Sequence, residues 1–307
     1  MLKRILKERR AKWEADQLAK MAARGVAPKD DKWKEGYKEP AQPDIESLPE
    51  LPEGWCWATV EQIAQIQGGI QKQPSRVPRN NAFPYLRVAN VFRGRLDLTN
   101  VEKMELFGNE LDTLRLEVGD MLIVEGNGSK TEIGRSALWK GEIPDCVHQN
   151  HIIRVRLNKV IPKYLDFYWN SPDGNKRVMN VAASTSGLYT LSIGKIAKLP
   201  CPLPPPVEQE QIVALVEEQM SIISELEKTV EHSLRRAERE RQSILREAFA
   251  GRLVAQDPED EPASVLLERI REERKRREEK GRAAKKQRGS QVQKSKKPLQ
   301  HVLIESN

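Results

Sequence analysis

Side chains able to read base edges gather in three polar segments of the chain. Arg and Lys can donate to guanine in the major groove of DNA, and Asn and Gln can both donate to and accept from adenine. Such side chains are presented best on loops that a rigid scaffold holds. The segments are GGIQKQPSRVPRNN, ANVFRGR and EGNGSK, and their candidate DNA-binding residues are Lys72, Gln73, Arg76, Arg79, Asn90, Arg93, Arg95, Asn127, Ser129 and Lys130.

Two glycine-containing segments also admit a plainer interpretation. In EGNGSK, Gly126 and Gly128 let the backbone approach a phosphate, but they are equally typical of a turn between two strands. Residues 184–189 are a fourth candidate, because small residues followed by the aromatic Tyr189 suit contact with a nucleic-acid backbone. A turn that packs two domains together explains the same residues equally well.

Residue patterns of the enzymes that act on nucleotides or DNA are missing. GNGSK does not have the GxxxxGK[ST] spacing that wraps a phosphate chain. The proline run LPPPVE is not the Asn/Asp-Pro-Pro-aromatic loop of a methyltransferase. Asp120 and Glu125 lack the nearby lysine of a metal-dependent nuclease site. We therefore predict no catalytic residue in this chain.

Cys146, His148 and His151 form a cluster of metal-ligand types. In a strand, positions 148 and 151 face opposite sides and do not converge on one tetrahedral ion. We expect two ordinary strand histidines, with no metal and no cofactor bound by this chain.

The positive charge of the chain is distributed unevenly. The formal net charge is +7 over 307 residues, but residues 280–297 hold eight basic residues and no acidic one. Residues 51–204 have 19 Lys and Arg against 15 Asp and Glu, a mild excess that is compatible with DNA binding. The basic tail, 280–307, is rich in Lys, Gln, Ser and Gly, so we expect disorder there. It either adds nonspecific phosphate contacts or has no function.

Cysteine use and hydropathy favour a cytoplasmic protein. The three cysteines, Cys56, Cys146 and Cys201, are odd in number and widely spaced, which favours reduced thiols in the core. No stretch approaches the 18 or more apolar residues of a membrane span, and the N-terminal residues are charged. We expect no membrane association.

The periodicities predict a globular α/β domain between helices. Residues 1–25 form an N-terminal spacer helix and 26–50 a connector, which Trp33 and Tyr37 pin to a neighbouring surface. Residues 51–206 form a mixed α/β domain with its own core. Inside it we expect helices at 60–66 and from 162 past Pro172, and strands at 83–91, 120–125, 136–140 and 148–157.

A long helix follows the proline run LPCPLPPPVEQEQ. Prolines disfavour a helix interior, so the helix begins near Val207 and spans 207–250, and Gly251 ends it. Apolar residues at steps of seven predict a seam that packs along another helix, as in an antiparallel coiled coil. The predicted interface residues are Val216, Ile223, Val230, Ala237 and Ile244. Residues 251–279 are expected to be a helical extension.

The segment from Leu199 to Arg277 resembles the conserved helical region of the specificity (S) subunits of type I restriction-modification systems. It contains the stretch SILREAFAGRLVAQDPEDEPASVLLERI. Three further motifs occur in that family's order: LPELPEGWCWATVEQIA, GDMLIVEGNGSKTEIGRSALWKGEIPDCVHQNHIIRVRL and STSGLYTLSIGKIAKLPCPLPP. The resemblance covers Leu2 to about Lys280. It implies a target-recognition domain followed by long spacer helices.

The same resemblance implies a noncatalytic subunit that recognises double-stranded DNA at a bipartite site. Its implied partners are methyltransferase (M) subunits that use S-adenosylmethionine and restriction (R) subunits that use ATP and Mg. Chemistry would belong to these partners.

An internal repeat bears on how the chain assembles. The first ten residues, MLKRILKERR, align with LLERIREERK at Leu266–Lys275. This similarity suggests that the chain contains one period of a tandem repeat. The alternative is two unrelated amphipathic helices of similar composition. The family usually has two recognition domains per chain, and this sequence has one. A second S chain in a homodimer would restore the pair. The alternative function is a truncated specificity-subunit fragment that acts as an assembly or interaction protein without productive DNA binding.

Overall fold

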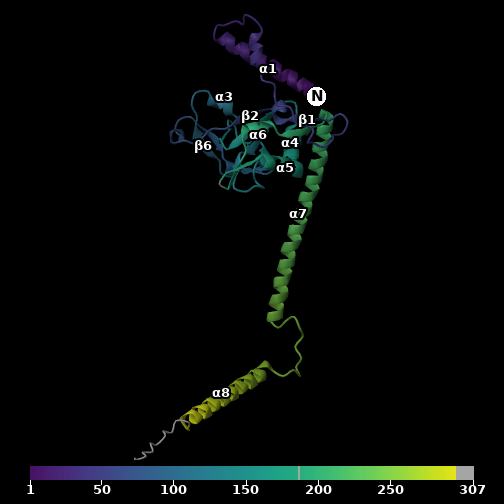
Figure 1. The fold of residues 1–307 in the computed structure, drawn as a ribbon. Coiled ribbons are helices and arrows are strands. Elements are labelled where there is room, and N and C mark those ends of the chain that lie inside the picture. Colours follow the sequence, from purple (N-terminus) through teal and green to yellow (C-terminus); the bar gives the residue numbers. More distant parts are fainter. Residues whose placement is uncertain (186, 295–307) are drawn as a thin grey trace, which may run out of the picture. The chain divides into compact units, whose positions relative to one another are not determined.

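The computed structural model describes residues 1–185 and 187–294, which fall into two compact units, Met1–Ser224 and Glu225–Asn307. The first unit holds all the described strands (Figure 1). Its central sheet is antiparallel, with the strands in the order β2-β11-β7-β9. The bounds of these strands are β2 Ala64–Gly68, β7 Met121–Val124, β9 Ser136–Leu138 and β11 Ile152–Leu157.

Four smaller sheets surround the central one. Their orders are β1-β14, β10-β3-β6, β12-β13-β8 and β4-β5, and only the β10–β3 pairing is parallel among the described strands. The bounds are β1 Cys56–Thr59, β3 Ala82–Leu86, β4 Val91–Phe92, β5 Arg95–Leu96, β6 Glu102–Glu105, β8 Gly126–Asn127, β10 Val147–His148, β12 Ala183–Thr185, β13 Leu188–Thr190 and β14 Pro200–Leu203.

Short helices connect these strands. They are α2 Val60–Ile63, α3 Glu110–Leu114, α4 Pro162–Asn170, α5 Pro172–Val181 and α6 Ile193–Ala197, with 3-10 turns η1 Lys32–Gly36, η2 Pro74–Arg76 and η3 Val88–Asn90. The expected continuation of the helix past Pro172 is wrong. Ser171 is extended, its hydroxyl accepts a hydrogen bond from the Gly174 amide at 3.2 Å, and Pro172 opens a new helix.

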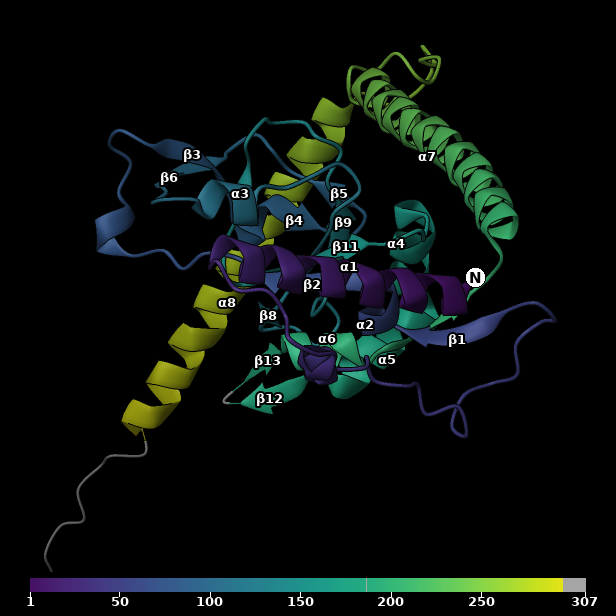
Figure 2. The same cartoon turned by 90° about the horizontal axis from the view of Figure 1, so that it is seen from above.

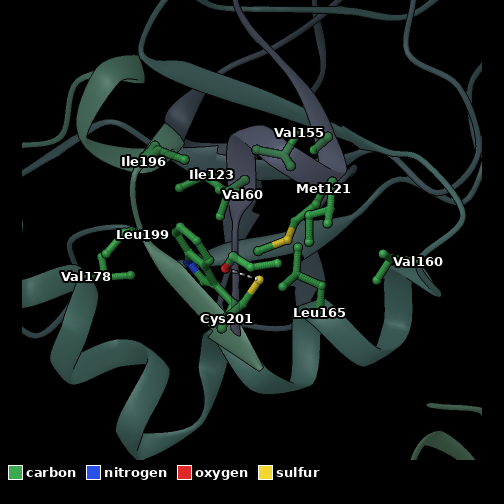
Figure 3. Packing of buried hydrophobic residues seen from close by; sticks show 14 of the residues in the cluster. Val60, Met121, Ile123, Val155, Val160, Leu165, Val178, Ile196, Leu199 and Cys201 are labelled. Atoms are coloured by element: carbon green, nitrogen blue, oxygen red, sulfur yellow. Dashed lines mark hydrogen bonds between the residues drawn. The ribbon is translucent and has the colours of Figure 1, made fainter. Parts of the chain in front are cut away.

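The main core lies between the central sheet, α4 and the β1–β14 pair (Figure 3). β7 reads MLIV and is buried at all four positions, which suits a strand covered on both faces. Cys201 lies in this core, where its Sγ is 3.4 Å from the carbonyl oxygen of Ala58. Burial raises the pKa of the Cys201 thiol to about 12, and that of Cys146 likewise. Both are core residues, as the sequence predicts.

Helix α1 (Leu2–Ala23) packs on the globular domain (Figure 2). Ile5 is fully buried against the main core, and the Arg9 guanidinium donates to the carbonyl oxygens of Glu61 and Ala64. The first half of α1 is therefore a docked helix rather than a free spacer. Farther along α1, Trp13 stacks on Trp33 with 6.0 Å between the ring centroids. Trp13 also meets the Tyr37 ring edge-on, with 5.3 Å between the centroids. Trp33 and Tyr37 therefore pin the connector to α1, a neighbouring surface of the kind predicted.

Helix α7 spans Pro206–Phe249, 44 residues or about 66 Å of helix. It begins one residue earlier than expected, because the first position of a helix tolerates proline. Gly251, with φ of +71°, follows its end. Of the seam, Ile223, Val230 and Ile244 are about half exposed, at 48%, 57% and 55%. The helix is present, and its pairing into a coiled coil stays a prediction.

Helix α8 spans Ala263–Lys294, so the expected boundary of disorder at residue 280 is wrong. Residues 280–288 read KGRAAKKQR, and Ala, Lys, Arg and Gln have high helix propensity even where no apolar face is buried. Residues 295–307, the rest of the predicted tail, lie outside the described residues.

Candidate nucleic-acid interface

The candidate segments meet around a turn formed by Gln149, Asn150 and His151. On one side of this turn, the Ile70 amide donates to the carbonyl oxygen of His148 at 2.9 Å, and the Asn150 amide donates to that of Ile70 at 3.0 Å. Ile70 belongs to GGIQKQPSRVPRNN, so the first predicted segment is fastened to the turn.

The opposite side of the turn is fastened to the segment EGNGSK. The Glu125 amide donates to the carbonyl oxygen of His151 at 2.9 Å, and the Leu191 amide donates to that of Glu125 at 2.8 Å. The side chains also meet, with Nδ1 of His151 3.2 Å from Oε2 of Glu125. Asn127 pairs with Tyr189 in the β8–β13 ladder, which joins the third segment to the fourth.

A third set of contacts links the turn to the strand that precedes ANVFRGR. The Gln149 amide donates to the carbonyl oxygen of Leu86 at 2.9 Å, and the Gln149 side-chain oxygen accepts from the Val88 amide at 3.3 Å. The turn thus contacts the first and third segments directly, and the other two through their neighbours. We call the turn 149–151, with residues 69–70, 125–130 and 188–191, the recognition edge.

The second segment folds as the β4–β5 hairpin and is braced against the third. Gly94 has φ of +72°, and its amide donates to the carbonyl oxygen of Ser136 at 2.8 Å. The Arg93 guanidinium donates to the carbonyl oxygen of Thr131 at 2.9 Å and to the Asn170 side chain at 3.2 Å. Arg95 is exposed, with its guanidinium 4.4 Å from the centroid of the Phe92 ring. Of the hairpin arginines, Arg95 therefore has the freer charge.

Two of the predicted readers are held by contacts within the fold. Asn90 is buried; its Oδ1 accepts from the Arg87 amide at 2.8 Å, and its Nδ2 donates to the carbonyl oxygens of Asp97 and Asn100. Its burial and these three hydrogen bonds favour a structural role for Asn90 over base reading. Arg76 makes two 2.8 Å hydrogen bonds to the carboxylate of Glu110, and its side chain is only 14% exposed. This geometry favours a structural role for Arg76.

The rest of the first segment is more accessible. Gln73 and Arg79 are exposed, whereas Lys72 pairs with Glu102 at 2.8 Å. The Arg79 amide donates to the Glu105 carboxylate at 2.8 Å, as do the amides of the next two residues, and these backbone hydrogen bonds lower the pKa of Glu105. The loop is held by its backbone, and the Arg79 side chain is left at the surface.

The third segment forms a braced turn with an exposed cation. The Asn127 side-chain oxygen accepts from the Ser129 amide at 2.8 Å, and the Ser129 hydroxyl lies 2.8 Å from that of Thr131. Ser129 and Lys130 are exposed. Asn127 therefore shapes the turn that presents Lys130 to solvent.

Part of the positive charge of the domain is internal. Arg154 is buried and donates to the carbonyl oxygens of Thr113 and Arg115. Arg135 donates to those of Val91 at 2.6 Å and Val88 at 3.1 Å. Burial lowers the pKa of both guanidinium groups. The excess of basic residues in the sequence therefore overstates the cationic surface available to phosphates.

The two histidines predicted to lie in a strand have different surroundings, His148 at the end of β10 and His151 in the turn. His148 is fully buried, and burial lowers its pKa to about 4, whereas the side chain of His151 is 55% exposed. Across residues 1–185 and 187–294, no group of three His, Cys, Asp or Glu residues is placed to hold a metal ion.

A cleft of about 670 Å³ lies at the opposite end of β2 and β11, between these strands and α1. Its lining contains both polar and apolar residues, among them Arg9, Trp13, Ile66, Asn158 and Ile193. The candidate readers do not line it, so the site is a surface rather than a pocket.

The turn 149–151 is absent from the sequence-based prediction. A continuous strand was expected from His148 to Leu157, but β10 ends at His148 and β11 begins at Ile152. The polar run HQNH between the apolar pairs CV and II is a signal for a turn at this place. Gln149, Asn150 and His151 carry the same donor and acceptor chemistry as the predicted readers.

Comparison with known proteins identifies relatives of this chain. The specificity subunit of the type I restriction enzyme EcoKI, from Escherichia coli strain K12, is 31% identical over 222 residues, which are 69% of this chain and 47% of that subunit. The StySPI specificity subunit of Salmonella potsdam is 32% identical over 206 residues, 63% of this chain and 44% of that subunit. The chain matches no family model.

Solved structures agree on the fold. The HsdS subunit from Thermoanaerobacter tengcongensis superposes with a TM-score of 0.50 at 17% identity, covering 71% of this chain and 54% of that one. A chain from a structure of the type I R-M system gives 0.53 at 18% identity, covering 82% and 56%. The fold is thus that of a recognition domain with long helices. The chain belongs to the specificity subunits of type I restriction enzymes, and it spans about half the length of the curated relatives it matches.

Proposed function

We propose that this chain is the noncatalytic, DNA-sequence recognition subunit of a type I restriction-modification complex. The observation that carries the proposal is the recognition edge, where one braced turn contacts two of the base-reading segments directly and is linked to the other two through neighbouring residues. Rigid presentation of donors and acceptors is what base readout requires. The exposed cations Arg79, Arg95 and Lys130 would supply phosphate contacts in this proposal.

Catalysis belongs to partner subunits in this proposal. The M subunits would bring S-adenosylmethionine, and the R subunits would bring ATP and Mg. Within the described parts of the chain, no helix is long and apolar enough to cross a membrane. We expect the complex to work in the cytoplasm, where it meets double-stranded DNA.

Helix α7 supplies the assembly surface. Its seam offers an apolar stripe that a second helix would cover, exposed at every position except the half-buried Val216. The stripe consists of Val216, Ile223, Val230, Ala237 and Ile244. Two copies joined through α7 would hold two recognition domains apart by a length of the order of the helix, about 66 Å. A twofold dimer presents identical readers in opposite orientations, so its target would be an interrupted palindrome.

Methylated positions in cells that contain this chain and its M subunit test the proposal. An interrupted palindrome supports recognition by a homodimer. An asymmetric bipartite motif would support recognition but require a second, different recognition chain. No methylation, together with no DNA binding in an electrophoretic mobility shift with the M subunit present, would contradict the proposal and leave an assembly protein as the function.

A further inference from the structure

We propose that Asn150 and His151 read base edges, with Glu125 as a positioning residue that fixes the imidazole of His151. This inference rests on the proposed function and assigns its specificity to a turn that the base-reading segments of the sequence do not include. The ligand is the major-groove edge of a base pair in double-stranded DNA.

The backbone of the turn is immobilised by its neighbours. Hydrogen bonds tie Gln149 to Leu86, Asn150 to Ile70 and His151 to Glu125, at 2.9, 3.0 and 2.9 Å. These three partners lie in three different parts of the chain. The Ile152 amide closes the turn on the carbonyl oxygen of Gln149 at 2.9 Å. Both backbone groups of Gln149, the Asn150 amide and the His151 carbonyl oxygen are thus bound within the fold, and the turn is held firmly enough to place a side chain against a base.

The side chains, in contrast, are left at the surface. His151 has 55% of its side chain exposed, and Asn150 is half-buried. Among the described residues, no backbone group hydrogen-bonds to either side chain. The Asn150 side-chain nitrogen lies 3.5 Å from Nε2 of His151. This differs from Asn90, whose side-chain amide is hydrogen-bonded to the backbone of Arg87, Asp97 and Asn100 on either side of the β4–β5 hairpin. Asn150 therefore keeps the donor and acceptor pair that recognises adenine.

Glu125 determines what His151 can recognise. A carboxylate accepts hydrogen bonds, so Nδ1 of His151, 3.2 Å from Oε2 of Glu125, carries the proton. When the ring is neutral, Nε2 then has one lone pair, which the Asn150 side-chain nitrogen faces at 3.5 Å in the free chain. Once the Asn150 amide turns to its own base, this single acceptor is open to a base amine. A base with an exocyclic amine, adenine or cytosine, donates to such an acceptor. The pair is therefore complementary to an adenine next to a base that carries an amine.

The chain offers a matched control for this assignment. Asn158 follows β11 at its far end, whereas Asn150 precedes it. The Asn158 amide donates to the carbonyl oxygen of Ile63 at 2.8 Å, and its side chain lines the cleft beside α1. Asn150→Ala and Asn158→Ala remove the same group from the two ends of one strand.

The experiment uses the full chain with its M subunit. The wild-type motif is determined first by sequencing methylated genomic DNA, and each variant is then assayed on duplexes carrying the four bases at every position. We expect Asn150→Ala to lose about tenfold of the discrimination at one adenine, and Asn158→Ala to keep the wild-type pattern. Glu125→Gln, which frees the tautomer, should change the preference at the adjacent position and spare the others.

Equal base preferences in Asn150→Ala and the wild type would overturn this inference alone, as would an equal loss in Asn158→Ala. A wild-type complex that neither binds nor methylates DNA would instead overturn the proposed function. If Asn150→Ala fails to fold, His151→Ala replaces it, because the side chain of His151 is largely outside the fold. Its expected result is a loss of discrimination at the adjacent position, and an unchanged pattern would refute the proposal.

Discussion

Gly69 passes so close to His148 that a Cβ at residue 69 would overlap the His148 carbonyl oxygen. The same atom would also overlap the carbonyl oxygen of Gln149 and Nδ1 of His148. The chain just after β2 and the turn 149–151 can therefore lie side by side only because residue 69 has no side chain.

We predict that Gly69→Ala disturbs the recognition edge and costs about 1 to 3 kcal/mol of unfolding free energy, the usual cost of overpacking. Gly128→Ala is the control, since nothing lies within 4 Å of a Cβ at that glycine. Urea unfolding measures both, and methylation assays show whether readout follows. Equal stability of the two variants would contradict the prediction.

The predicted readers Arg76 and Arg79 should separate in their effects. Arg76→Ala removes the bidentate partner of Glu110, so we expect a loss of about 1 kcal/mol in stability. Arg79→Ala removes an exposed cation, and we expect unchanged stability with weaker, less salt-dependent DNA binding. Thermal unfolding and mobility shifts over a salt series distinguish them. A stable Arg76→Ala protein with altered base preference would restore Arg76 as a reader.

Stability should fall as the pH is lowered from about 6.5 toward 4 because of His148. Burial, followed by the charge of Arg154, lowers the pKa of His148 from 6.5 to about 4. The unfolded chain then binds a proton that the folded chain does not, so the stabilisation is complete above pH 6.5 and is lost as the pH falls. The contribution is up to roughly 3 kcal/mol. His148→Asn should flatten the dependence of unfolding free energy on pH. An unchanged slope of unfolding free energy against pH in this variant would refute the prediction.

The seam of α7 should matter for assembly and not for the globular domain. Ile223→Asp with Val230→Asp places charges on a stripe that is about half exposed in the single chain. If a partner helix covers the stripe, each unpaired charge costs several kcal/mol. We expect loss of dimerisation or of co-purification with the M subunit, and an unchanged melting temperature of the globular domain.

Ser221→Asp is the control for the seam variant, because residue 221 lies two positions before Ile223 in the heptad and so away from the stripe. It adds a charge to the same turn of the helix. Light scattering and co-purification compare the two. Assembly at the wild-type level in the seam variant would exclude α7 as the interface.

Several elements of this structure can be predicted from local sequence patterns. The proline run and the seven-residue repeat mark the beginning and seam of α7, because proline stereochemistry and helical periodicity act within a few residues. Polar glycine-containing segments indicate loops for the same reason. The order of the sequence motifs indicates the family, and membership of the family implies the mixed α/β fold class.

Tertiary contacts decided which polar side chains are free to recognise DNA. Arg76 and Glu110 are far apart in sequence, as are Arg93 and Thr131, so no local pattern shows that these arginines are already paired. The run from His148 to Leu157 has the composition of one strand, yet contacts with Ile70, Leu86 and Glu125 break it into a turn. Hydrogen bonds between distant segments satisfy some donors and acceptors and leave others at the surface. The sequence alone determined the chemistry available, and only the folded chain determined where that chemistry remains unpaired.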